Sequence, residues 1–115
     1  MYSYYKNKKT NAEIFEESRQ WAEKDLASGL LGRRMFGLIR SPDLLKEAYK
    51  EKGIDIRIIA GDCVFGDTVA DADGYNLVMD AEIEKRFGPK VWEEIHERHL
   101  ELRRLRTKNS WVYNL

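Results

Sequence analysis

The sequence is poor in the residues that would place it in several common classes of protein. Cys63 is the only cysteine in 115 residues, so an internal disulfide is excluded and we expect a reducing, cytoplasmic setting. The first ten residues lack the apolar core of a signal peptide, and no apolar run approaches the length of a membrane span. Internal repeats and low-complexity linkers are absent as well. We therefore expect a protein that does not associate with membranes.

Basic residues are missing from one long stretch of the chain. No lysine or arginine occurs between Ala60 and Glu84, although the whole sequence holds 20 basic and 20 acidic residues. The balanced total argues against nucleic-acid or membrane binding over the whole surface. The acidic residues of the stretch suggest instead a local site, bordered by residues 54–80. They are Asp62, Asp67, Asp71, Asp73, Asp80, Glu82 and Glu84.

Length and apolar content indicate a single folded domain. A chain of 115 residues with 43% hydrophobic residues can build one core but is short for two. Three tryptophans, six tyrosines and four phenylalanines supply large side chains for that core. We expect one domain over residues 1–115, with residues 1–9 as a flexible arm or an edge strand.

Two helices are predicted in the first half of the chain. Thr10 and Glu13 match the capping box, so a helix should run from there to about Ser28 and stop at Gly29. Ser41 followed by Pro42 marks the start of a second helix, which Gly53 should end. The segment between them, residues 30–40, contains two glycines and fits a loop, a short strand or a helical turn.

The central stretch reads as an antiparallel meander. Ile54, Ile56 and Ile58 alternate with polar residues, which is typical of a half-buried strand over residues 54–60. We expect a second strand over residues 63–70, a hairpin turn over residues 71–74 and a third strand over residues 75–79.

The remaining residues complete the predicted α+β fold. A short helix over residues 81–87 should be followed by a last helix over residues 89–106. Residues 110–115 should form a fourth strand or a docked arm. The expected fold is a small antiparallel sheet of three to four strands packed with about four helices.

The loop aspartates and two histidines are the first candidate site. The aspartates do not form an EF-hand loop, because Val69 would occupy its first ligand position and no helix is expected before it. An irregular divalent-cation site is the alternative to a plain polar turn. His96 and His99 lie three residues apart on the last helix and can share a metal, but the HExxH order is absent. His99 also lies on the apolar seam, which favours a hydrogen-bonded, partly buried histidine.

Two further candidates are a lone thiol and an arginine cluster. Cys63 near acidic residues is a poor nucleophile, so a core cysteine is the better interpretation. Arg33, Arg34 and Arg40 precede the start of a helix and could hold an anion, although no P-loop spacing is present. The alternative is a connecting segment whose arginines face solvent.

The last helix ends in a basic region that also carries aromatic residues. Such a region can bind phosphates or single-stranded nucleic acid, but it can equally pair with the acidic centre of the same or another copy. Its residues are Arg98, Arg103, Arg104, Arg106, Lys108, Trp111 and Tyr113.

These observations favour a small cytoplasmic binding or interaction protein with a small-ligand pocket beside the acidic segment. We expect a homodimer, aligned by opposite charges and joined by the apolar C-terminal tail. The alternatives are a small metal-dependent hydrolase using the histidines and loop aspartates, and a nucleic-acid accessory protein using the C-terminal arginines. No catalytic residue, resident metal or cofactor is assigned. The ligand-binding candidates are Asp62, Asp67, Asp71, Asp73, His96, His99, Arg33 and Arg34.

Overall fold

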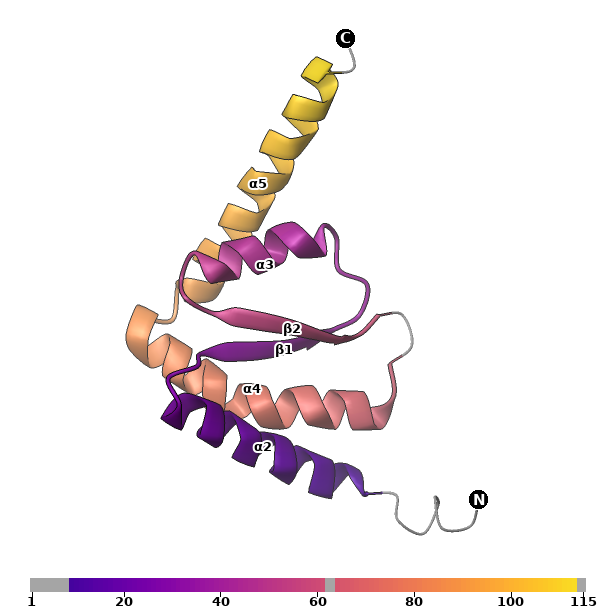
Figure 1. Ribbon diagram of the computed structural model, residues 1–115, viewed down its shortest axis with the longest axis vertical. Helices are drawn as coiled ribbons and strands as arrows, with labels where there is room; N and C mark the ends of the chain where they lie inside the picture. The colour runs from indigo at the N-terminus through magenta and orange to yellow at the C-terminus, as the bar shows by residue number, and fades with distance from the viewer. Residues whose placement is uncertain (1–8, 62–63, 114–115) are drawn as a thin grey trace.

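The fold is dominated by helices, which surround a sheet of two parallel strands. The computed structural model describes residues 9–61 and 64–113. Its elements, in chain order, are α2 (Asn11–Ala27), β1 (Gly32–Phe36), α3 (Pro42–Lys50), β2 (Asp55–Ala60), α4 (Gly66–Phe87) and α5 (Val91–Tyr113). In Figure 1, α3 lies on one side of the two strands and α4 and α2 on the other.

The β1–α3–β2 segment is the centre of the molecule. Parallel strands need a crossover connection, and α3 supplies it. Gly32 is in register with Asp55, Arg33 with Ile56 and Arg34 with Arg57. A register shift follows Met35, so the pairing ends in an irregular step. α3 packs against β2, and its residues Leu45, Ala48 and Tyr49 belong to the same core cluster as Ile56.

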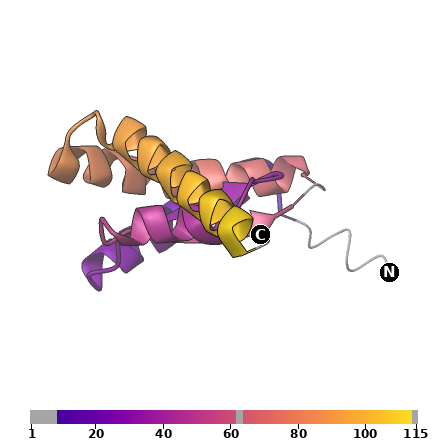
Figure 2. The same ribbon diagram turned by 90° about the horizontal axis from the view of Figure 1, so that it is seen from above.

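The core lies where α3, α4 and α5 meet the two strands. Its most completely buried large side chains are Ile54, Met79, Ile83, Ile95 and Val91. On the far side of α4, α2 packs so closely that Gly74 faces the backbone of Phe15 without room for a side chain. Beyond the core α5 continues outward, crossing α3 at an angle and carrying the chain to the far end of the molecule (Figure 2). Among the helices in the described part of the chain, none is long and apolar enough to cross a membrane.

Several elements agree with the sequence patterns. The capping box of α2 is present, with the Glu13 amide donating to Thr10 Oγ1 at 3.1 Å. α3 starts at Pro42 after Ser41, but the Ser41 side chain makes no capping bond and its backbone is left-handed, with φ 49°. Its carbonyl instead accepts from the amides of Leu44 and Leu45. β2 occupies the predicted alternating stretch.

The predicted antiparallel sheet of three to four strands is wrong. Residues 66–87, for which we expected two strands, a hairpin turn and a short helix, form the single helix α4. Its buried residues Ala72, Tyr75, Met79 and Ile83 recur every three or four positions, which is the helical period. The strand that pairs with β2 is β1, and the pairing is parallel. β1 lies within residues 30–40, for which the sequence fitted a loop, a short strand or a helical turn.

The predictions for the chain ends have separate outcomes. Helix α5 continues through residue 113, so the predicted fourth strand or docked arm over residues 110–115 is wrong up to that point. Residues 114–115 lie outside the described residues, as does almost all of the predicted arm over residues 1–9.

Candidate functional site

Two consecutive arginines on β1 organise the polar contacts around the sheet. Neighbouring residues of a strand point to opposite faces, so Arg33 and Arg34 serve different sides of the molecule. Arg33 binds Asp80 of α4 in a bidentate ion pair, with Nε–Oδ1 at 2.8 Å and Nη2–Oδ2 at 3.0 Å. Both side chains are largely shielded from solvent. This geometry is the strongest form of arginine–carboxylate contact.

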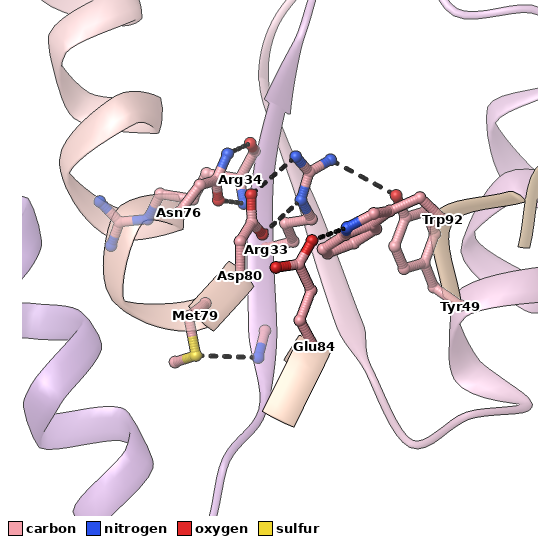
Figure 3. A network of polar contacts seen from close by, with 9 residues as sticks. Arg33, Arg34, Tyr49, Asn76, Met79, Asp80, Glu84 and Trp92 are labelled. Atoms are coloured by element: carbon pink, nitrogen blue, oxygen red, sulfur yellow. Dashed lines mark hydrogen bonds and ion pairs between the residues drawn. The ribbon is translucent and has the colours of Figure 1, made fainter. Parts of the chain in front are cut away.

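The rest of the Arg33 surroundings is fully occupied (Figure 3). Its Nη1 donates to Tyr49 Oη at 3.4 Å, and its guanidinium lies 4.8 Å from the ring centroid of Trp92. The Trp92 indole in turn donates to Glu84 at 2.7 Å. Burial alone would lower the pKa of Arg33, but the bond to Asp80 raises it, and the pKa stays above its ordinary value. Arg33 therefore ties β1 to α3, α4 and α5, and each of its three guanidinium nitrogens donates to one of these elements.

Arg34 makes a second network on the opposite face. Its Nη1 forms an ion pair with Asp71, which also accepts from Ser18 Oγ at 2.7 Å. The guanidinium lies 4.2 Å from the ring centroid of Tyr75, whose hydroxyl donates to Asp25 at 2.6 Å. Burial, reinforced by the bond to Asp25, raises the pKa of Tyr75 above its ordinary value. This network joins α2, β1 and α4.

A small polar cavity lies beside Arg34. Its volume is about 130 Å³, room for only a few water molecules or a small ion. Basic and acidic side chains are mixed around it, so no single charge is favoured. Arg57 and Asp55 are both exposed and make no ion pair with another described residue. The cavity lining is Asp25, Leu30, Arg33, Arg34, Asp55, Arg57 and Tyr75.

The predicted aspartates are spread along α4 rather than gathered in a loop. Asp67 lies in the first turn and accepts from the Thr68 amide at 2.9 Å. Asp71 faces inward to Arg34, while Asp73 is exposed. Asp62 and the neighbouring Cys63 lie outside the described residues.

The two histidines of α5 have different surroundings. His99 is buried, and its Nε2 lies 3.2 Å from the carbonyl oxygen of Ser41, so this nitrogen acts as a donor to the start of α3. His96 is exposed. Asp71 lies between α2 and β1, and the described residues bring no three His, Cys, Asp or Glu side chains together in a group that could hold a metal.

The basic end of α5 is partly neutralised within the chain. Arg98 binds Glu51, the residue that follows α3, through Nε at 2.9 Å, and Arg106 binds Asp43 in the first turn of α3. The remaining basic side chains border a shallow hollow on the outer face of α5, together with Leu100 and Thr107. They are Arg103, Arg104 and Lys108.

The outer edge of β1 is covered by α4. Asn76 accepts from the Arg34 amide at 2.8 Å and donates to the Arg34 carbonyl oxygen at 2.7 Å, so its amide group substitutes for a neighbouring strand (Figure 3). The Gly32 amide similarly donates to Met79 Sδ at 3.4 Å. Covered edges of this kind cannot accept another strand.

The outer edge of β2 has no such cover. The Asp55 amide donates inward to the Leu31 carbonyl at 2.9 Å, so the backbone groups of Ile56 and Ile58 point outward by strand alternation. Within residues 9–61 and 64–113, no hydrogen bond reaches the outward amides of these two residues. A hollow of about 480 Å³ borders this edge, lined by Asp43, Lys46, Glu47, Lys50, Ile54, Asp55 and Ile56.

Sequence reasoning identified the two arginines and Asp71 as candidates, but not that Arg34 pairs with Asp71 and Arg33 with Asp80. Asp80 and Asn76 sit on α4, which the sequence had divided into strands and turns. The open edge of β2 was missed for a related reason, because the expected meander would have paired that edge with residues 63–70. A helical period through Ala72, Tyr75 and Met79 was the available signal.

The Arg33–Asp80 pair gives a direct test of these contacts. Replacing Asp80→Asn should remove the bidentate pair and leave a shielded guanidinium without its counter-charge, lowering the free energy of unfolding by about 1–3 kcal/mol. Urea unfolding followed by circular dichroism measures the loss. Asp73→Asn on the exposed face of the same helix is the matched control and should change it by less than about 0.5 kcal/mol. Equal effects of the two substitutions would contradict a stabilising role for the pair.

No family model, curated protein or solved structure matches this chain.

Proposed function

We propose that this protein is an interaction protein that takes another chain as an added strand at the outer edge of β2. The observation that carries the proposal is the direction of the β2 backbone. Asp55 is bonded inward to Leu31, so the amides and carbonyls of Ile56 and Ile58 face outward with no described partner. Backbone groups of this kind are a ready template for another strand.

The surroundings of the edge support this interpretation. The hollow beside it gives an incoming strand room next to α3, and its floor is formed in part by Ile54 and Ile56. In strand addition, main-chain hydrogen bonds supply affinity while the flanking side chains select the partner. A sheet of two strands is also short of the number that usually makes a stable sheet, so an added strand would complete it.

The arginines, the histidines and the basic end of α5 give weaker support for binding over catalysis than the β2 edge does. Arg33 and Arg34 are already engaged with Asp80 and Asp71. A metal-dependent hydrolase would need a third ligand beside His96 and His99, and those two residues lie in different surroundings. A nucleic-acid accessory role would have to rely on Arg103, Arg104 and Lys108 near the end of α5, which form no ion pair with another described residue.

Hydrogen exchange of the monomer tests the proposal. In protein diluted until it is monomeric, the amides of Ile56 and Ile58 should exchange nearly as fast as in an unfolded peptide. Those of Asp55 and Arg57, which point to β1, should be protected by roughly 100-fold or more. Mass spectrometry with single-residue fragmentation measures both pairs in one sample. Strong protection of Ile56 and Ile58 in the monomer would mean that the chain covers this edge itself, and would end the proposal.

A further inference from the structure

We infer that the strand added to β2 is the β2 strand of a second copy, antiparallel to the first and related by a two-fold axis at Ile56. The inference rests on the proposed function, because it names the partner for the same edge. It makes a four-stranded sheet of order β1–β2–β2–β1 across the two copies. A two-fold arrangement of this kind is the commonest form of closed self-association.

The backbone pattern fits this register. The outward groups of Ile56 meet those of the partner's Ile56, and such a pair exchanges both of its N–H···O bonds. The next outward amide, that of Ile58, then lies opposite the carbonyl of the partner's Ile54. The Ile54 amide is already bonded to the Tyr49 carbonyl at 3.1 Å and needs no partner from the second copy. In this register the outward amides of Ile56 and Ile58 therefore both find an acceptor.

Charges on the solvent face of β2 are complementary in the same register. Pairing about Ile56 places Asp55 opposite the partner's Arg57 and Arg57 opposite the partner's Asp55. Both side chains are exposed and make no ion pair with another described residue. Opposite charges directly across an antiparallel pair are stabilising, and like charges are destabilising. A parallel pairing in register would place Asp55 beside Asp55 and is disfavoured.

The outer row of α3 repeats the complementarity one layer above the strands. Asp43, Lys46, Glu47 and Lys50 all line the hollow at the β2 edge. When α3 runs antiparallel to its copy, Lys46 faces the partner's Glu47 in both directions. Lys50 faces the partner's Asp43, which already binds Arg106 within its own chain, so this outer contact is the weaker of the two.

The charge balance of the surface selects a second copy over a strongly charged partner. The edge and the outer row of α3 carry three acidic residues and three basic residues, for no net charge. A polyanion or a basic peptide would meet as much repulsion as attraction on such a surface. A second copy matches each of the exposed β2 charges with its opposite.

Sedimentation velocity over a range of protein concentrations tests the inference. We expect the unmodified chain to dimerise reversibly. Asp55→Arg or Arg57→Asp alone would create two like-charge contacts across the two-fold axis and raise the dissociation constant about tenfold or more. The double variant Asp55→Arg with Arg57→Asp restores opposite charges and should return the constant to within about threefold of the original value. All four proteins should keep the same circular dichroism spectrum, because both positions are exposed.

A fourth variant separates backbone pairing from charge. Ile58→Pro removes an outward amide that β1 does not use, so it should weaken the dimer about tenfold or more. A monomer at all concentrations, or a dimer that both single charge variants leave unchanged, would overturn the inference. If the dimer is rejected in this way but the amides of Ile56 and Ile58 exchange fast in the monomer, the proposal of strand addition at the β2 edge is retained. Only the second copy is then rejected as the partner.

Discussion

Replacing Gly74→Ala should destabilise the protein by about 2–4 kcal/mol, although alanine is normally the better helix residue. A β-carbon at this position would overlap the carbonyl oxygen of Phe15 and lie 2.9 Å from its carbonyl carbon. These are backbone atoms of α2, which cannot move without separating α2 from α4. The helix-propensity gain of about 1 kcal/mol is smaller than the cost of opening that contact. Thermal unfolding should show a midpoint lower by roughly 10 °C or more.

Gly61→Ala is the matched control for this substitution. A β-carbon on Gly61 meets nothing within 4 Å, so the change should alter stability by less than about 0.5 kcal/mol. A Gly74→Ala protein as stable as the Gly61→Ala protein would mean that α2 and α4 are not in close contact.

Ile56→Asp should be the second strongly destabilising substitution, with an expected loss of about 3 kcal/mol or more. Ile56 is 5% exposed and belongs to the core cluster, whose buried members are apolar and aromatic side chains. The residue would have to be buried as a charge or protonated, and both states cost free energy. Urea unfolding at a concentration where the protein is monomeric separates this effect from any loss of dimer.

Arg57→Asp provides the comparison on the same strand. It introduces the same side chain one residue further along, on the exposed face, so the monomer should change by less than about 0.5 kcal/mol. Similar losses at positions 56 and 57 would contradict the alternation of buried and exposed residues along β2.

Features set by short-range patterns were predicted correctly from the sequence. The capping box fixed the start of α2 because Thr10 and Glu13 bond each other's backbone groups within one turn. The alternation of isoleucine with polar residues fixed β2, because successive side chains of a strand point to opposite faces. Pro42 fixed the start of α3 in the same local way.

Helix α4 shows where local signals were misleading. Asp71 and Gly74 resemble a turn because aspartate and glycine favour turns when no other contact decides. In the folded protein each has a partner far along the chain. Asp71 binds Arg34 and Ser18, and Gly74 admits the backbone of Phe15. Both residues therefore hold α4 against its neighbouring elements, and this role depends on contacts that the local sequence does not show.

The candidate sites divide in the same way. Arg33 and Arg34 could be chosen from the sequence, but whether they were free or paired depended on Asp80 and Asp71, 47 and 37 residues further along the chain. The open edge of β2 depended on the direction and order of the strands.

The sequence by itself determined where α2, α3 and β2 begin, because caps and alternation act over a few residues. Only the tertiary structure decided that the sheet is parallel and that one of its edges is covered. Strand direction and edge cover depend on which distant segments pack together. Here α3 crosses over between the strands, and Asn76 of α4 occupies the edge of β1 while the edge of β2 has no described cover.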